Sequence, residues 1–212
     1  MVEKLLNAYI KTLEGYASKS YLSSEQAVYI DELEQELEKE AYRAKYDEQT
    51  DPLTGVLNKT YFIRRMKELA SREVVPTGVI CVNINDWMYA HVHYGEEESD
   101  RLITIVADIL KRNADAQTII GRVDGDIFHV LMPLSEEEEV QEYCRKIEED
   151  CLQFQDDKLA LSVATGYVIK TNVEEDFEQL FSDAEYVMFE HKLQIKNAPG
   201  YRERLEKGSN LK

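Results

Sequence analysis

The order in which strand-like and helix-like segments alternate after residue 57 is the feature that most constrains this fold. Four short apolar runs rich in β-branched residues are typical of buried strands: residues 78–85 (GVICVNIN), 119–123, 127–132 and 159–169. Four segments with apolar side chains at three- and four-residue spacing are predicted helices: residues 58–71, residues 96–111, a helix capped by Ser135, and residues 177–196. The order helix–strand–helix–strand–strand–helix–strand–helix predicts an α+β fold in which helices cover a mostly antiparallel sheet.

Residues 1–48 differ in composition from the rest of the chain, because they contain no proline and one glycine and are dense in Glu, Lys, Leu, Ala and Tyr. We predict a first helix over residues 2–16 and a second helix that Ser23 or Ser24 caps. An apolar stripe runs along the second helix: Ile30, Leu33, Leu37, Ala41 and Ala44. The stripe is compatible with a dimerising or packing helix pair and also with a solvated lead-in helix.

The formal net charge of −17 argues against non-specific binding to nucleic acid or to anionic lipid, because both need a basic face. A small anionic ligand is not excluded, since it needs only a few local cations. Cys81, Cys144 and Cys151 show no zinc-like spacing and suit a reducing cytoplasm. No stretch approaches the ~20 apolar residues of a membrane span, and the N-terminus does not have the pattern of a signal peptide. The sequence therefore predicts a cytoplasmic chain without a membrane segment.

Five segments, all in one order and spread over most of residues 46–200, resemble the GGDEF family of bacterial diguanylate cyclases. The first covers residues 51–62 (DPLTGVLNKTYF) and is similar to the family pattern D-x-L-T-G-L-x-N-R-x-x-F. These residues also have a physical reading, because Thr54 and Gly55 favour a turn and Asn58 is placed to cap the helix that follows.

The other four segments follow in register. They are residues 83–100, similar to D-x-D-x-F-K-x-x-N-D-x-x-G-H-x-x-G-D; residues 122–128 (RVDGDIF), similar to R-x-G-G-D/E-E-F; residues 162–166 (SVATG), similar to S-x-G-x-A; and residues 184–197 (AEYVMFEHKLQIKN), similar to A-D-x-A-M-Y-x-A-K-x-x-G-R-N. The resemblance implies the nucleotide-cyclase, palm-like GGDEF fold, which is α+β with a mostly antiparallel central sheet flanked by helices. It implies three parts: an N-terminal helical segment for linkage or dimerisation (residues 1–48), a degenerate GGDEF domain (residues 49–200) and a C-terminal tail (residues 201–212).

The resemblance also assigns candidate site residues by position. Asn83 lies where the family has its metal-binding aspartate, and Asp126 is the only motif acid that survives in the hairpin. These two are the candidate metal ligands, and Asp126 is the candidate catalytic residue. The candidate nucleotide-binding residues are His91 and Asp100 for guanine, Gly125 in the phosphate loop, and Lys192 and Lys196 for triphosphate. The two lysines lie four residues apart, on one face of the last predicted helix.

Three substitutions damage the site that the resemblance implies. Asn83 supplies an amide oxygen in place of a carboxylate, although Mg²⁺ favours anionic oxygen. Asp124 replaces the first glycine of the hairpin and puts a carboxylate where triphosphate would lie, while Ile127 replaces a glutamate. Asp124-Gly125 is still a strong signal for a type I′ turn, so the hairpin itself is expected to persist.

An alternative is that Asp86, Asp124 and Asp126 rebuild a metal site. Against this alternative, Asp86 lies three residues beyond Asn83, and strand alternation predicts that the two side chains point to opposite faces. The other interpretation is that Asp124 and Asp126 are turn residues of a solvated hairpin.

The family's inhibitory R-x-x-D site for cyclic di-GMP would fall on Asp115 and Thr118, so that motif is absent. The sequence predicts a catalytically inactive signalling or regulatory domain that retains at most weak GTP binding. The alternative is an active diguanylate cyclase, converting two GTP to cyclic di-GMP, with low activity or altered nucleotide preference. No resident cofactor is expected, and Mg²⁺ or Mn²⁺ would be needed only if nucleotide binding survives. The expected partners are GTP and, through the N-terminal helices, a second copy of the chain or another protein.

Overall fold

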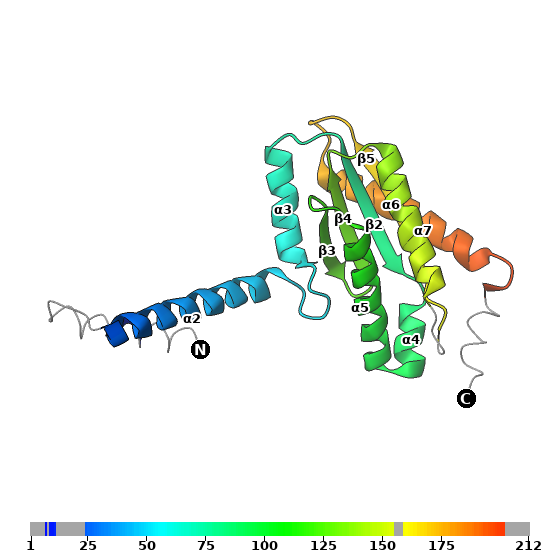
Figure 1. Ribbon diagram of the computed structural model, residues 1–212. Helices are drawn as coiled ribbons and strands as arrows, with labels where there is room; N and C mark the ends of the chain where they lie inside the picture. Colours follow the sequence, from blue (N-terminus) through cyan, green and yellow to red (C-terminus); the bar gives the residue numbers. More distant parts are fainter. Residues whose placement is uncertain (1–6, 8, 12–23, 155–158, 202–212) are drawn as a thin grey trace. The chain divides into compact units, whose positions relative to one another are not determined.

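The computed structural model describes residues 7, 9–11, 24–154 and 159–201. The chain divides into two compact units, Met1–Gln49 and Thr50–Lys212. In the first unit, helix α2 spans Ser24–Gln49, as Figure 1 shows. No helix in the described part of the chain combines the length and the apolar character that crossing a membrane requires.

The predicted apolar stripe of α2 is only partly buried. Leu33 is buried, Ile30 and Leu37 are half-buried, and Ala41 is exposed. Tyr9, in the helical residues before α2, donates a hydrogen bond from its hydroxyl to Glu34, so the two helical segments of this unit are in contact. Most of the predicted first helix, Ser23 and the side chain of Ala44 lie outside the described residues.

The second unit contains one mixed sheet and its covering helices. The elements, in chain order, are β1 (Leu57–Asn58), α3 (Lys59–Ser71), β2 (Thr77–Ile84), α4 (Trp87–Tyr94), α5 (Glu96–Asn113), β3 (Ile119–Asp124), β4 (Ile127–Pro133), α6 (Glu137–Gln153), β5 (Val163–Lys170) and α7 (Phe177–Asn197). The strand order is β1-β3-β4-β2-β5, in which β1 and β3 are parallel and all other neighbours are antiparallel. The predicted α+β fold with a mostly antiparallel sheet is therefore confirmed.

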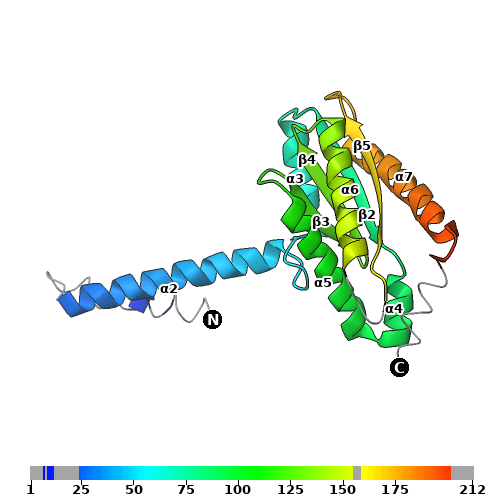
Figure 2. The same ribbon diagram turned by 45° about the vertical axis from the view of Figure 1, so that its right-hand side comes forward.

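Helices cover both faces of this sheet, which explains the continuous apolar run of β2. Helices α5 and α6 pack on one face, and α3 and α7 pack on the other (Figures 1 and 2). In β2, Ile80 and Val82 belong to the core under α5 and α6, while Val79 and Cys81 belong to the core under α3 and α7. Because β2 is an inner strand between β4 and β5 and every one of its residues is buried, apolar side chains lie on both of its faces.

Two elements were not predicted from the sequence. Helix α4 has a single buried side chain, Ala90, and so carries no apolar stripe. Strand β1 is two residues long and pairs with β3, besides an isolated bridge between Leu57 and Thr50. The last strand also begins later than predicted, at Val163 instead of Leu159.

The two predicted helix caps have different outcomes. Asn58 caps α3 as predicted, since its side chain accepts the Tyr61 N–H at 3.1 Å. The prediction that Ser135 caps α6 is wrong, because the N-cap is Glu136. Glu136 and Glu139 form a reciprocal capping box, in which the Glu136 N–H donates to Glu139 Oε2 at 2.9 Å. The box satisfies two free donors where a serine cap would satisfy one.

The β3–β4 hairpin persists, but its turn is not type I′. Gly125 and Asp126 form the turn, and neither adopts the left-handed conformation that a type I′ turn requires. A bulge between Arg122 and Asp124 supplies the local twist instead. Arg122 also stabilises the turn, because its Nε and Nη2 donate hydrogen bonds to the Gly125 carbonyl at 3.0 and 2.9 Å.

Candidate functional site

Three side chains that the sequence assigned to a metal and phosphate site are in direct contact. Asn83, buried at the end of β2, donates from Nδ2 to Asp126 Oδ2 in the hairpin at 3.0 Å. Lys192 of α7 donates from Nζ to Asn83 Oδ1. Partial burial lowers the pKa of the Lys192 ammonium, and the nearby Asp126 carboxylate opposes that shift. The trio pairs one carboxylate with one ammonium through a neutral amide.

A second contact of the same kind lies one helical turn further along α7. The ammonium of Lys196 is 3.0 Å from Asp86 Oδ1, and the Tyr201 hydroxyl donates to the other oxygen of that carboxylate. The prediction that Asp86 and Asn83 point to opposite faces is wrong. Strand β2 ends at Ile84, and Asp86 adopts a left-handed conformation with φ 57°, which turns its carboxylate towards α7. Alternation applies only while the strand continues.

The first family-like segment supports the hairpin instead of touching the trio. The Arg122 guanidinium contacts both carboxylate oxygens of Asp51 at 3.2 Å, besides the Gly125 carbonyl. The Thr54 N–H and hydroxyl donate to the same Asp51 carboxylate at 3.0 and 2.7 Å. Sequence reasoning missed this clamp, although both of its charged residues lie in quoted motifs.

The residues assigned to guanine lie on α4 and α5. The exposed His91 has its Nδ1 3.1 Å from the Ser99 hydroxyl, and its ring stacks on Trp87 with centroids 5.7 Å apart. Asp100 follows on α5 and is half-buried. The Trp87 ring covers Gly125, since a Cβ built on that glycine would lie 3.5 Å from it. The indole Nε1 of Trp87 is buried without a hydrogen-bond partner.

The alternative metal site of Asp86, Asp124 and Asp126 is not formed. In the described part of the chain, these carboxylates do not make a group close enough for one ion. Asp86 pairs with Lys196, and the exposed Asp124 accepts the Gly125 N–H at 2.8 Å. Asp124 is thus the last residue of β3, and its carboxylate contacts the turn.

Asp115 and Thr118, at the positions of the family's inhibitory motif, close the loop before β3. The Asp115 carboxylate accepts the Thr118 hydroxyl at 2.6 Å and the N–H groups of Gln117 and Thr118 at 2.9 and 2.8 Å. These hydrogen bonds, above all that of the Thr118 hydroxyl, hold the pKa of Asp115 below its usual range. The pair has a structural role in this chain.

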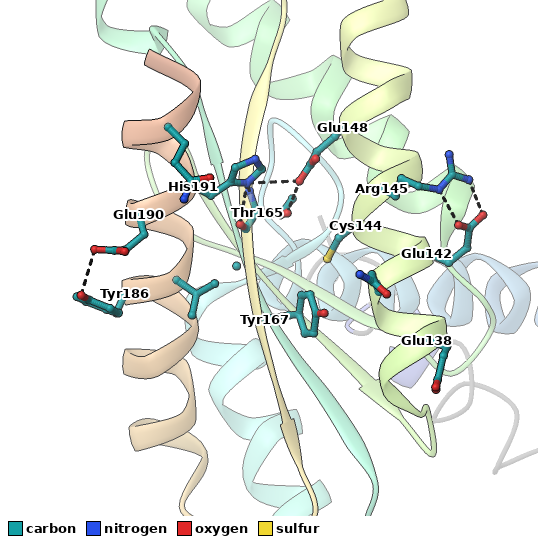
Figure 3. A pocket seen from close by; sticks show the side chains of 14 residues that line it. Glu138, Glu142, Cys144, Arg145, Glu148, Thr165, Tyr167, Tyr186, Glu190 and His191 are labelled. Atoms are coloured by element: carbon teal, nitrogen blue, oxygen red, sulfur yellow. Dashed lines mark hydrogen bonds and ion pairs between the residues drawn. The ribbon is translucent and has the colours of Figure 1, made fainter. Parts of the chain in front are cut away.

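A separate groove of about 800 Å³ runs between α6 and α7 along β5, an edge strand of the sheet (Figure 3). At its centre, Thr165 donates from its hydroxyl to Glu148 and from its N–H to His191 Nδ1 at 3.2 Å. Four of the lining side chains are glutamates: Glu138, Glu142, Glu148 and Glu190. Their charge does not suit a triphosphate, so the groove does not replace the site at the end of β2.

The fold and this site define the class of protein as an α+β domain of the nucleotide-cyclase type, with a helical segment before it. Residues 48–198 match the family described as "Diguanylate cyclase, GGDEF domain". The chain therefore belongs to the GGDEF family.

Individual relatives are distant. Probable diguanylate cyclase DgcT of Escherichia coli (strain K12) is 26% identical over 101 residues, which cover 47% of this chain but only 22% of that protein. The coiled coil and GGDEF domain of DgcB from Caulobacter crescentus, solved with c-di-GMP, has a TM-score of 0.70 at 18% identity, covering 81% of this chain and 96% of that one. Diguanylate cyclase SiaD of Pseudomonas aeruginosa, solved with its activator SiaC, has a TM-score of 0.66 at 17% identity, covering 90% and 73%.

Proposed function

We propose that this chain is a catalytically inactive GGDEF domain that works as a signalling or regulatory module related to cyclic di-GMP synthesis. The observation that carries the proposal is the contact of Asn83 with both Lys192 and Asp126. The resemblance assigns Asn83 to the position of the metal-binding aspartate, and its amide supplies a neutral oxygen, already occupied by the Lys192 ammonium, where a divalent cation needs anionic oxygen.

The charge balance supports an inactive site. Asp126 is the one carboxylate in the trio, and its charge interacts with the Lys192 ammonium, so a single carboxylate faces any Mg²⁺ or Mn²⁺ there. A unit charge pair at 4 Å is worth about 4 kcal/mol at an effective dielectric near 20. The loss of one carboxylate therefore strongly weakens the binding of a divalent cation. This donor set does not fit a Mg²⁺ ion.

The hairpin supports the same proposal. The exposed Asp124 carboxylate stands where the family offers a bare glycine backbone to phosphate. Trp87 lies against Gly125, and Ile127 supplies no acid. Residual GTP binding through Asp100, Lys192 and Lys196 would require the two lysines to leave Asn83 and Asp86.

The second candidate is a diguanylate cyclase with low activity or altered nucleotide preference. It is favoured by one feature, the exposed His91 at the guanine-reading position, which offers a different hydrogen-bonding edge to a base. Saturation binding with several nucleoside triphosphates and metal separates the candidates, because an enzyme must bind its substrate.

The deciding experiment incubates the purified chain with GTP and Mg²⁺ or Mn²⁺ and measures cyclic dinucleotide. We expect no product above a mock preparation, and product above that level overturns the proposal. The combined variant Asn83→Asp, Asp124→Gly and Ile127→Glu tests the scaffold. Recovered synthesis in that variant would support loss of the site as the cause of inactivity.

We further propose that the N-terminal helical segment associates with a second copy of the chain or with a partner protein. Val28 and Tyr29, adjacent on α2, and Tyr46 further along it are exposed apolar side chains that an association through this helix would cover. Light scattering after size exclusion measures the state of the full chain. A mass of one chain at all concentrations contradicts self-association, and the double variant Val28→Glu, Tyr29→Glu should dissociate a dimer that uses this surface.

A further inference from the structure

Cys81, His129 and Glu185 form a cluster that the proposed function does not use. They come from three elements, β2, β4 and α7, on the face of the sheet that α3 and α7 cover. One ligand-type atom of each, the Sγ, an imidazole nitrogen and a carboxylate oxygen, all lie within 4.8 Å of one another. We propose that this cluster is a binding site for a borderline divalent cation of the Zn²⁺ type.

The donor chemistry points to that class of ion. Thiolate, imidazole and carboxylate are the three ligand types that Zn²⁺ takes in proteins, whereas Mg²⁺ and Ca²⁺ take oxygen ligands. Two ligands of a tetrahedral Zn²⁺ lie about 3.3–3.7 Å apart, given bonds of about 2.0–2.3 Å. His129 Nε2 and Glu185 Oε1 are already 3.1 Å apart, so only small movements would place all three ligands around one ion.

The surroundings hold the imidazole and leave a way in. The His129 ring stacks on Phe181 with centroids 4.2 Å apart and 7° between the planes, and it meets the edge of Phe62 at 5.9 Å. Burial lowers the pKa of His129, which favours the neutral imidazole that binds metal. Cys81 is fully buried, whereas the Glu185 side chain is 50% exposed and gives the ion access from α7.

The binding step is balanced by one released proton. Burial raises the pKa of the Cys81 thiol, so the cysteine is protonated before binding. The ion takes the place of the thiol proton, which is released to solvent. Its bonds to His129 and Glu185 replace the hydrogen bond between these two side chains. Three protein ligands leave the fourth position to water.

Such a site would fasten α7 to the sheet. Cys81 and Asn83 are two residues apart and point to the same face of β2. On α7, Glu185 and Lys192 are two turns apart, about 10 Å along the helix axis. An ion at the cluster would therefore fix the helix that carries Lys192, beside the candidate site.

Sequence reasoning missed the cluster because the three ligands have no local spacing. Cysteine spacing alone indicated no zinc site, and His129 and Glu185 gave no signal of their own.

The test is a titration of the purified chain with Co²⁺ as the spectroscopic probe, followed by competition with Zn²⁺. We expect one equivalent of Co²⁺ to give a thiolate-to-metal charge-transfer band that Zn²⁺ removes. Cys81→Ala should abolish the band. The matched control Cys144→Ala, which removes a buried cysteine of α6 from the other core, should keep it.

A second pair of variants keeps the test decisive if Cys81→Ala does not fold. Glu185→Gln changes an exposed side chain and should weaken Zn²⁺ at least tenfold, measured by the Zn²⁺-dependent rise in melting temperature. The control Glu178→Gln, another exposed glutamate of α7, should leave the affinity unchanged. The proposal is overturned by a wild-type chain that gives no charge-transfer band, or by equal Zn²⁺ affinity in Glu185→Gln and wild type.

Discussion

Lys192 on α7 donates a hydrogen bond to Oδ1 of Asn83 at the end of β2, across 109 residues of chain. Asn83 in turn donates a hydrogen bond from Nδ2 to Asp126 Oδ2 in the hairpin, at 3.0 Å. Helix α7, strand β2 and the hairpin are thus joined by three polar side chains, one cationic, one neutral and one anionic, and this charge pattern decides what the site can bind.

Asn83→Asp is expected to create a divalent metal response that the wild type lacks. The substitution places a second carboxylate beside Asp126, so the site gains the negative charge that Mn²⁺ needs. At ten times its dissociation constant, Mn²⁺ would stabilise the variant by about 1.4 kcal/mol, or roughly 3–5 °C in melting temperature.

Thermal unfolding with and without Mn²⁺ measures that effect. Asn172→Asp is the matched control, because it also adds one carboxylate. Asn83 pairs with the start of β5, whereas Asn172 follows the other end of that strand, so this variant should not respond to Mn²⁺. An equal Mn²⁺ shift in wild type and in Asn83→Asp would contradict the charge argument.

Asp86→Ala is expected to destabilise the domain more than Asp86→Gly does, by about 1 kcal/mol. Both variants lose the contacts with Lys196 and Tyr201. Glycine adopts φ 57° without the steric cost that alanine incurs. The difference in stability between the two variants therefore measures the cost of the left-handed backbone conformation. Denaturant unfolding of both proteins provides the number, and equal stabilities would mean that the backbone had moved.

Gly166→Ala is expected to cost roughly 3 kcal/mol or more, or to prevent folding. A Cβ at this position of β5 would lie 2.1 Å from the Met188 nitrogen and 2.3 Å from the Ala184 oxygen. Both are backbone atoms, so α7 as a whole would have to move away from the sheet.

Gly125→Ala is the matched control for that clash. Its Cβ would meet only the Trp87 ring at 3.5 Å, which is ordinary contact, so its stability should stay within about 0.5 kcal/mol of wild type. Chemical denaturation compares the two variants directly. A Gly166→Ala protein as stable as Gly125→Ala would show that α7 does not pack as closely as described.

Asp150→Asn is expected to cost up to about 1 kcal/mol at neutral pH and progressively less in acid. Asp150 on α6 accepts hydrogen bonds from Asn113 and Arg112 of α5, each at 2.8 Å, and these hold its pKa below the ordinary 3.8. A lowered pKa in the folded state gives stability that is complete above 3.8 and is lost as the pH falls through the folded value.

Unfolding free energies of wild type and variant, measured from neutral pH down to about pH 3, should therefore converge on the acid side. Asp108→Asn, which breaks an exposed ion pair with Lys111, controls for the loss of one surface carboxylate. A stability gap that stays constant with pH would rule out ionised Asp150 as its source.

The sequence was enough to predict the order of four helices and four strands, the burial of β2 and the residue types at the candidate site, but not β1 or α4. The apolar run of β2 predicts burial on both faces, and Asn58 predicts the start of α3. Both signals depend only on a few neighbouring residues. The amide at Asn83 and the cations at Lys192 and Lys196 are likewise properties of single positions.

Tertiary structure alone decided which of these groups meet. Lys192 reaches Asn83, and Lys196 reaches Asp86, because α7 packs across the sheet and because β2 ends before Asp86 turns left-handed. Cys81, His129 and Glu185 converge for the same reason, with no spacing that a linear pattern could reveal. Contacts between residues far apart in the chain depend on packing, and packing depends on all of the elements at once.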